Sequence, residues 1–152
     1  MIVKFFELKK KISDGNSFYL LYGQNSGLID ETIDTILKPN FSKNIFYYDE
    51  IDILTKADQF KEEIFNKSFF ETDKLIIINR ATDKILYLIE DIIDQKIENT
   101  KIIIKAGLLE KKSKLRNFFE KNKEQIVVPF YEDNYQSLLK ITQNFFIEKK
   151  IK

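Results

Sequence analysis

The residues best arranged for chemistry form a polar loop at residues 22–31, which reads YGQNSGLIDE. Its glycines, Gly23 and Gly27, suggest a phosphate-binding loop of the type GxxxxGK(S/T). In such a loop, backbone N–H groups surround the phosphates, the Lys neutralises their charge, and the Ser or Thr hydroxyl binds Mg²⁺. Here one residue too few separates the glycines, Leu28 stands where the Lys is needed, and an acidic pair follows at 30–31, close to where an anion would sit. We therefore predict a degenerate nucleotide loop, Gly23, Gly27 and Leu28, that binds no phosphate.

A second place for nucleotide chemistry is the end of the apolar run at 74–79, KLIIIN. A strand of the Walker B type ends in acidic residues, which hold Mg²⁺ and polarise water. This run instead ends in Asn79 and is followed by Arg80 and Ala81. Because both catalytic ends are missing together, the pattern indicates a nucleotide-binding architecture without its chemistry.

Other catalytic sites are also excluded or disfavoured by residue type. The chain contains no His and no Cys, which removes imidazole bases, thiolate nucleophiles and ordinary zinc sites. The sequence contains no GxGxxG motif, which argues against a dinucleotide site. It also lacks the acidic pair that a receiver domain requires after its first strand, here the run at 17–22. Carboxylate pairs at 62–63 and at 91 and 94 fall in helical segments, where a solvated face is the expected role. We predict no catalytic residue and no cofactor.

A basic run, Lys111, Lys112, Lys114 and Arg116, is the one cluster of charge that suggests DNA or a neighbouring subunit as a partner. The formal net charge is only +1, from 25 basic and 24 acidic residues, so no general attraction to nucleic acid supports it. A solvated helix face is the favoured interpretation of the run.

The elements that must position these residues alternate along the chain. Five short runs, rich in β-branched and aromatic residues, predict strands covered on both faces: 17–22, 44–48, 74–79, 101–105 and 125–130. Apolar residues at helical spacing lie between them, at 28–37, 54–65, 85–93 and 108–119. Strands alternating with helices predict an α/β fold, a five-stranded parallel sheet flanked by helices.

The ends of the chain carry further expected helices. A short helix at 5–12 precedes the first strand, and a last helix at about 135–147 follows the fifth. The N-terminus has no long apolar stretch of a signal peptide, and no run approaches the roughly 20 apolar residues that cross a bilayer. We predict a cytoplasmic protein without a membrane partner.

Three segments together resemble the delta subunit family of DNA polymerase III. They are FYLLYGQNSGLIDETI (18–33), FNKSFFETDKLIIINRA (65–81) and KIIIKAGLLEKKSKLRNFFEK (101–121), in the family's order and spacing over about residues 17–140. The resemblance implies an AAA+-like (P-loop NTPase-like, degenerate) core with strand order 5-1-4-3-2. It implies an AAA+-like clamp-binding domain at 1–133 and, at 134–152, the first helix of a lid domain, so that the chain is an N-terminal part of the subunit.

The same resemblance assigns a partner-binding turn to Ser68, Phe69 and Phe70. In the family, a Ser-Leu-Phe turn at a helix tip inserts into a hydrophobic pocket of the β sliding clamp, and Phe69 replaces its usual Leu. Since Phe65 already extends the core face of the preceding helix, two adjacent aromatic side chains cannot both reach one core easily. We expect at least one of them to be exposed. Similar peptides at 136–139 and 143–146 are expected to face the core.

The resemblance therefore implies a non-catalytic clamp-loader subunit in DNA replication. Its partners are the β sliding clamp, the ATP-binding and delta-prime-like subunits and, through the complex, DNA. It is not an enzyme by itself but part of the DNA polymerase III holoenzyme, a nucleotidyltransferase complex. Two alternatives stay open: a divergent P-loop ATPase, which requires nucleotide at Gly23–Gly27, and a DNA-binding module built on the basic run, which requires salt-dependent DNA affinity.

Overall fold

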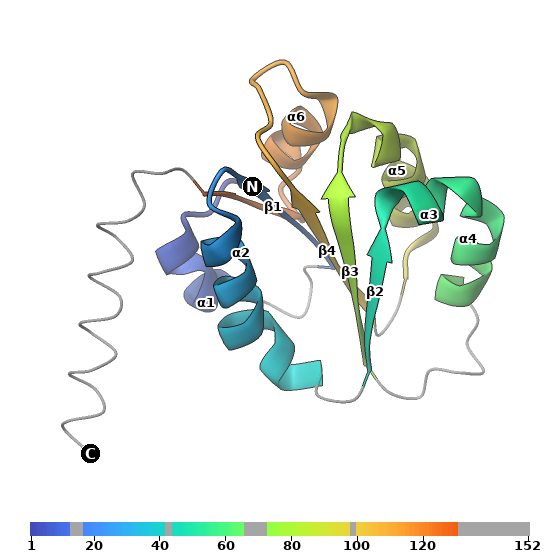
Figure 1. Ribbon diagram of the computed structural model, residues 1–152, viewed down its shortest axis with the longest axis horizontal. Coiled ribbons are helices and arrows are strands. Elements are labelled where there is room, and N and C mark those ends of the chain that lie inside the picture. Colours follow the sequence, from blue (N-terminus) through green and yellow to red (C-terminus); the bar gives the residue numbers. More distant parts are fainter. Residues whose placement is uncertain (13–16, 42–43, 66–72, 98–99, 131–152) are drawn as a thin grey trace.

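A single parallel sheet organises the chain. The computed structural model describes residues 1–12, 17–41, 44–65, 73–97 and 100–130. Its five strands are all parallel and lie in the order β2-β3-β4-β1-β5 (Figure 1). They are β1 (Phe18–Gly23), β2 (Ile45–Asp49), β3 (Lys74–Ala81), β4 (Thr100–Ala106) and β5 (Ile126–Phe130). This is the predicted order 5-1-4-3-2 seen from the opposite edge, so the predicted fold class is confirmed.

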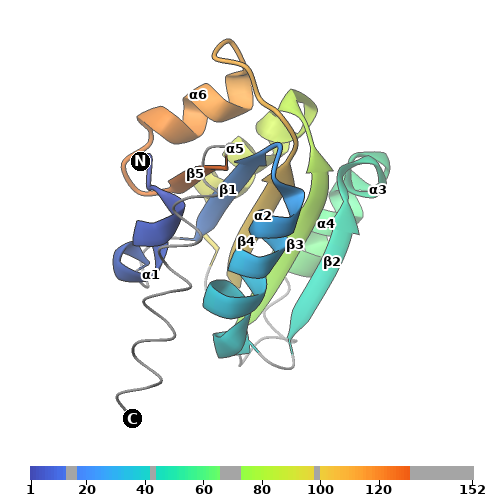
Figure 2. The ribbon, with the colours of Figure 1, turned by 60° about the vertical axis from the view of Figure 1, so that its left-hand side comes forward.

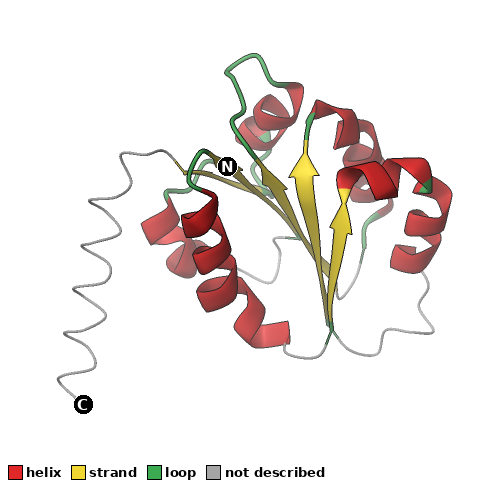
Figure 3. Cartoon of the chain, viewed as in Figure 1, coloured by secondary structure: helices red, strands yellow, loops and turns green. Residues whose placement is uncertain are grey.

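Helices cover both faces of the sheet, which gives three layers (Figures 2 and 3). On one face lie α1 (Leu8–Lys11), which follows the 3₁₀ turn η1 (Phe5–Glu7), and α2 (Ser26–Thr32), which continues through a π-helical turn, η2 (Ile33–Leu37), and a 3₁₀ turn, η3 (Lys38–Phe41). The other face carries α3 (Glu50–Thr55), α4 (Ala57–Phe65), α5 (Leu86–Gln95), which follows the 3₁₀ turn η5 (Asp83–Ile85), and α6 (Lys114–Lys121). No helix in the described ranges combines the length and apolarity needed to cross a membrane.

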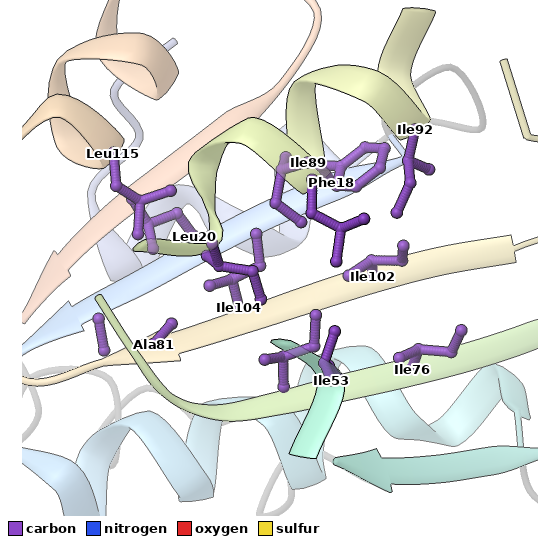
Figure 4. Close-up of a cluster of buried hydrophobic side chains, with 14 of the residues drawn as sticks. Phe18, Leu20, Ile53, Ile76, Ala81, Ile89, Ile92, Ile102, Ile104 and Leu115 are labelled. Carbon is purple, nitrogen blue, oxygen red and sulfur yellow. The ribbon is translucent and has the colours of Figure 1, made fainter. Parts of the chain in front are cut away.

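Continuous apolar runs form the inner strands because each of these strands is buried on both faces. Side chains of a strand alternate between the faces. Accordingly Ile76 and Ile102 pack in the cluster under α4 and α5, whereas their neighbours Leu75 and Ile103 pack in the cluster under α1 and α2. Figure 4 shows the first cluster, in which Phe18 and Ile102 lie beside Ile89 and Ile92 of α5. The register pairs Ile76 of β3 with Ile102 of β4, so the isoleucine runs 76–78 and 102–104 meet side by side in the interior of the sheet.

Three details differ from the sequence-based expectations. Strand β2 lies at the edge, as the predicted order requires, but it is not covered on both faces as its apolar run suggests: Phe46 is 43% exposed and Tyr47 is 57% exposed. The helix predicted for 54–65 is interrupted at Lys56, which separates α3 from α4. The helix predicted for 108–119 begins only at Lys114, because the Ser113 hydroxyl caps it by accepting from the Arg116 N–H at 3.2 Å.

The N-terminal segment closes the outer edge of β5. The Val3 N–H donates to the Val127 carbonyl at 2.9 Å, and the Val127 N–H donates to the Met1 carbonyl at 3.0 Å. The Met1 amino group donates to the carbonyls of Phe119 at 2.7 Å, Gln125 at 2.8 Å and Asn122. The chain thus supplies its own covering for this edge of the sheet. The predicted helix at 135–147, both peptides within it and the domain boundary after 133 lie outside the described residues.

Candidate functional site

The connection between β1 and α2, where sequence analysis expects a degenerate phosphate loop, is very short. Strand β1 ends at Gly23 and α2 begins at Ser26, so only Gln24 and Asn25 lie between them. The Asn25 Oδ1 accepts from the Leu28 N–H at 3.1 Å and serves as the helix cap. A protein side chain therefore takes up a helix N–H group that could otherwise meet a phosphate.

Leu28 and its surroundings are equally unsuited to an anion. Leu28 is 5% exposed and packs in the core under α2, so the position where a phosphate loop carries its Lys points into the protein. The nearby Lys105 at the end of β4 forms an ion pair with Asp30 of α2, which neutralises it. The arrangement supports the prediction that this loop does not bind phosphate.

The backbone geometry at position 23 explains why a glycine is needed there. Its φ is +138°, and a Cβ atom built on it would lie 1.9 Å from the Phe130 carbonyl oxygen of β5. Its N–H donates to the Gly107 carbonyl at 3.0 Å. Only glycine tolerates such a backbone conformation at such a close approach. The glycine therefore serves the packing of β1 against β5.

The end of β3 offers no carboxylate for a metal ion. The strand ends in a bulge between Ile78 and Ala81, with Arg80 at a φ of +57°. The Arg80 side chain is 86% exposed, and its Nη1 lies 3.8 Å from the Asp49 Oδ2 at the end of β2. Across the described ranges, no group of three or more acidic side chains is placed to hold a metal ion.

The acidic residues at this carboxyl end of the sheet instead bind the protein's own N–H and O–H groups. Glu50, which is 7% exposed, accepts from the Thr82 N–H at 2.8 Å and from the Thr82 hydroxyl at 2.8 Å. Asp83 accepts from the Ser113 hydroxyl at 2.6 Å and from the Leu115 N–H at 3.1 Å. These hydrogen bonds, that of Ser113 above all, lower the pKa of Asp83 below its usual value. Sequence analysis missed both carboxylates, since only the fold brings their donors to them.

The basic run does not form one surface. Lys111, Lys112 and Lys114 are exposed, and Lys112 lies 3.4 Å from Glu110. Arg116 is only 16% exposed at its side chain: its Nε donates to Glu120 at 2.6 Å, and its guanidinium lies 5.3 Å from the Tyr22 ring centroid. The arginine is thus engaged within the protein, while the three lysines remain at the surface.

The predicted partner-binding turn, Ser68, Phe69 and Phe70, lies outside the described residues. Its flanks are described. Helix α4 ends at Phe65, which packs against the core as expected, and β3 begins at Lys74. The turn is therefore attached to the described fold between the end of α4 and the amino end of β3.

A small polar contact joins these two flanks to the edge strand. The Lys74 ammonium donates to the Glu63 carbonyl in the last turn of α4 at 3.4 Å, and the Tyr48 hydroxyl donates to the Glu63 carboxylate at 2.9 Å. Burial lowers the pKa of Lys74 to about 8, although the Glu63 charge acts in the opposite direction. Burial and the Glu63 carboxylate raise the pKa of Tyr48 to about 12. Sequence analysis missed this contact, because no motif marks it.

Comparison with protein families gives one match. The family model described as DNA polymerase III, delta subunit, matches residues 19–130. The match begins in β1 and ends at the last residue of β5, so it includes every strand, the two-residue loop before α2 and the flanks of residues 66–72. A search of curated proteins found none that matches the chain.

Proposed function

The chain belongs to the DNA polymerase III delta subunit family, and from this membership we propose that it is a non-catalytic clamp-loader subunit. In this role it binds the β sliding clamp and promotes the opening of the ring for its loading onto DNA. The observation that carries the proposal is the family match, which spans the parallel sheet from β1 to β5.

The geometry around β1 supports a role without nucleotide chemistry. The Asn25 side chain caps α2, Leu28 is buried, and Lys105 is paired with Asp30. Phosphate binding would require each of these three arrangements to change. We therefore assign ATP binding to the neighbouring subunits of the loader.

We assign the clamp contact to Ser68, Phe69 and Phe70. Phe65, the last residue of α4, is partly buried and packs against the core. An aromatic pair beyond the helix end then suits a hydrophobic pocket on a partner. A central aromatic of this kind contributes about 2 kcal/mol or more to binding when it is a hot spot.

Promotion of ring opening follows from differential affinity. A subunit that binds the clamp more tightly when one ring interface is open shifts the clamp towards the open state by the ratio of the two affinities. This chain then needs no energy source, because ATP acts on the rest of the loader and controls access to the turn. We assign residues 1–133 to the clamp-binding domain, residues 134–152 to the start of a lid domain, and the whole chain to the cytoplasm.

Titration of the chain with the sliding clamp of the same organism tests the proposal. We expect binding without nucleotide, and loss of at least about 95% of the affinity in Phe69→Ala/Phe70→Ala, which corresponds to about 2 kcal/mol. A matched control is Tyr87→Ala/Leu108→Ala, which removes two side chains that are 60% and 61% exposed at the opposite end of the sheet. The control should bind as the parent does.

Two results would contradict the proposal. The first is a parent chain that does not bind the clamp. The second is binding of ATP–Mg²⁺ by the parent chain, which would favour the ATPase alternative. For ring opening, two fluorophores across one clamp interface should separate on addition of the chain. An unchanged distance at saturating binding would limit the role to docking.

A further inference from the structure

The outer edges of the two outermost strands, β5 and β2, differ in what covers them. The outer edge of β5 is hydrogen-bonded to Met1 and Val3, whereas no other described strand lies on the outer side of β2. Strand β2 also exposes two adjacent aromatic side chains, Phe46 at 43% and Tyr47 at 57%. Exposed aromatic groups on an edge strand favour association with a partner, so proteins rarely leave them without a reason.

The two rings point to opposite faces of the sheet, because neighbouring side chains of a strand alternate. Phe46 shares its face with Tyr48, whose ring stacks edge-on against Phe60 of α4 with 5.1 Å between centroids. Tyr47 lies on the other face, where the Lys38 ammonium is 5.1 Å from its ring centroid. Phe46 alone of the pair is therefore on the side of α4.

Lys74 places Phe46 beside both flanks of the proposed clamp-binding turn. The Lys74 ammonium lies 5.8 Å from the Phe46 ring centroid and donates to the Glu63 carbonyl in the last turn of α4. Lys74 is itself the first residue of β3. The Phe46 ring thus lies close to the end of α4 and to the start of β3.

The remaining exposed large apolar side chains of the described chain lie elsewhere. Ile51, Tyr87 and Leu108 follow the carboxyl ends of β2, β3 and β4, and Ile2 and Phe6 belong to the N-terminal segment beside β5. A partner that binds at the end of α4 reaches Phe46 before any of these. Among the exposed large apolar side chains of the described residues, Phe46 is therefore the one nearest to such a partner.

We propose that Phe46, which lies beside the end of α4 and the start of β3, forms a second apolar contact with the sliding clamp. This inference rests on the proposed function, since it assigns the β2 edge to the same partner. Tyr47 takes no part in this contact, because its ring projects from the opposite face.

The paired variants Phe46→Ala and Tyr47→Ala test this assignment by titration with the sliding clamp. Both variants remove an exposed aromatic ring of β2 that has a lysine of another element beside it, Lys74 for Phe46 and Lys38 for Tyr47, so their effects on the fold should be similar. We expect Phe46→Ala to weaken binding about fivefold or more, the effect of losing about 1 kcal/mol, and Tyr47→Ala to stay within about twofold. Circular dichroism and thermal unfolding of each variant check the fold.

A second measurement does not depend on affinity. The chain has no cysteine, so Phe46→Cys and Tyr47→Cys each introduce a single thiol. We expect the clamp to slow alkylation of the thiol at position 46 and to leave that at position 47 unchanged, as followed by the mass of this chain.

The outcomes separate this inference from the proposed function. If the parent binds the clamp but Phe46→Ala binds equally well and its thiol is not protected, the inference fails and the proposed function stands. Equal weakening or equal protection at both positions would overturn the assignment of a single face. A self-associating chain that both alanine variants make monomeric would assign the edge to a second copy and overturn the inference. A parent that binds no clamp removes both proposals.

Discussion

Strands β5 and β2 are the two outer strands of one sheet, and each is five residues long, yet the chain treats them in opposite ways. The N-terminal segment bonds to the outer edge of β5, and the Phe130 ring lies 5.8 Å from that of Phe5. Strand β2 has no such covering within the described chain and exposes two aromatic rings. An apolar strand sequence therefore does not by itself indicate burial. The position of the strand in the sheet, and the segments that pack beside it, determine whether its side chains are buried.

The closed character of the β5 side continues at the carboxyl ends of the strands. There Gly23 allows β1 and β5 to approach, and Asp83 caps α6 from another element. Polar groups at this end are satisfied by the protein itself. The β2 side instead leaves two aromatic rings exposed, so stability and the proposed clamp binding should respond to different substitutions.

Gly23→Ala should break the closed side and have the largest effect. The new Cβ would overlap the Phe130 carbonyl oxygen at a positive φ, so we expect a loss of about 3 kcal/mol or more in the free energy of unfolding. Urea unfolding measures it. The control is Gly27→Ala in α2, where the nearest atom to a Cβ is 3.9 Å away and a gain of up to about 1 kcal/mol is expected. Equal stability of the two variants would contradict the close approach.

Asp83→Ala should weaken the same side by about 1 kcal/mol, the usual contribution of a helix cap. Because the folded pKa of Asp83 lies below its usual value, its contribution is present above pH 4 and is lost as the pH falls through the folded pKa. The difference between parent and variant should therefore shrink in acid. Asp94→Ala, at an exposed site on α5, serves as the control and should leave stability unchanged. A gap that persists at low pH would argue that the charge is unimportant.

Phe46→Ala and Tyr47→Ala should sharpen the comparison, because they change the open edge. Each ring is partly exposed, so we expect each variant to lose about 1 kcal/mol or less in thermal or urea unfolding. A much larger loss for Phe46→Ala would indicate a core role for the ring. Its clamp titration would then need to be read against the destabilised fold.

Lys74→Met should give the smallest change and the opposite sign. Burial lowers the folded pKa of Lys74 to about 8, so between about pH 8 and its ordinary value the unfolded chain binds more protons, and the parent gains stability as the pH rises. We expect the variant to be slightly more stable at pH 7 and to lose this advantage by about pH 10. Urea midpoints across this range measure the difference. An advantage that grows with pH would contradict the assigned sign.

Much of the fold could be predicted because its signals are local. The runs 74–79 and 101–105 each contain three consecutive isoleucines, and the strand order follows from the family resemblance. The predicted order already places β2 at the edge, but the run at 44–48 looks as apolar as an inner strand, so the exposure of Phe46 and Tyr47 did not follow from the apolar pattern. The late start of α6 also escaped, because the decisive feature is the cap of Ser113 and not the leucines before it.

The candidate site divides in the same way. The prediction that Gly23, Gly27 and Leu28 bind no phosphate could be argued from residue types alone, and the geometry of Asn25 supports it. The capping role of Asp83 and the position of Phe46 beside Lys74 depend on residues 30 or so positions apart, which no spacing rule connects. The clamp-binding turn itself stays a prediction.

The position of β1 between β4 and β5 has a consequence for how the chain folds during synthesis. Strand β1 pairs with β4 and with β5, the last two strands along the described chain. On a ribosome that adds roughly 5–20 residues per second, the apolar β1 waits roughly 5–20 seconds until both neighbours have emerged. Strands β2 and β3 can pair earlier, but the sheet cannot be completed from the N-terminal end. We therefore expect truncations before residue 126 to yield aggregates and not a smaller domain, because β1 then lacks its β5 partner.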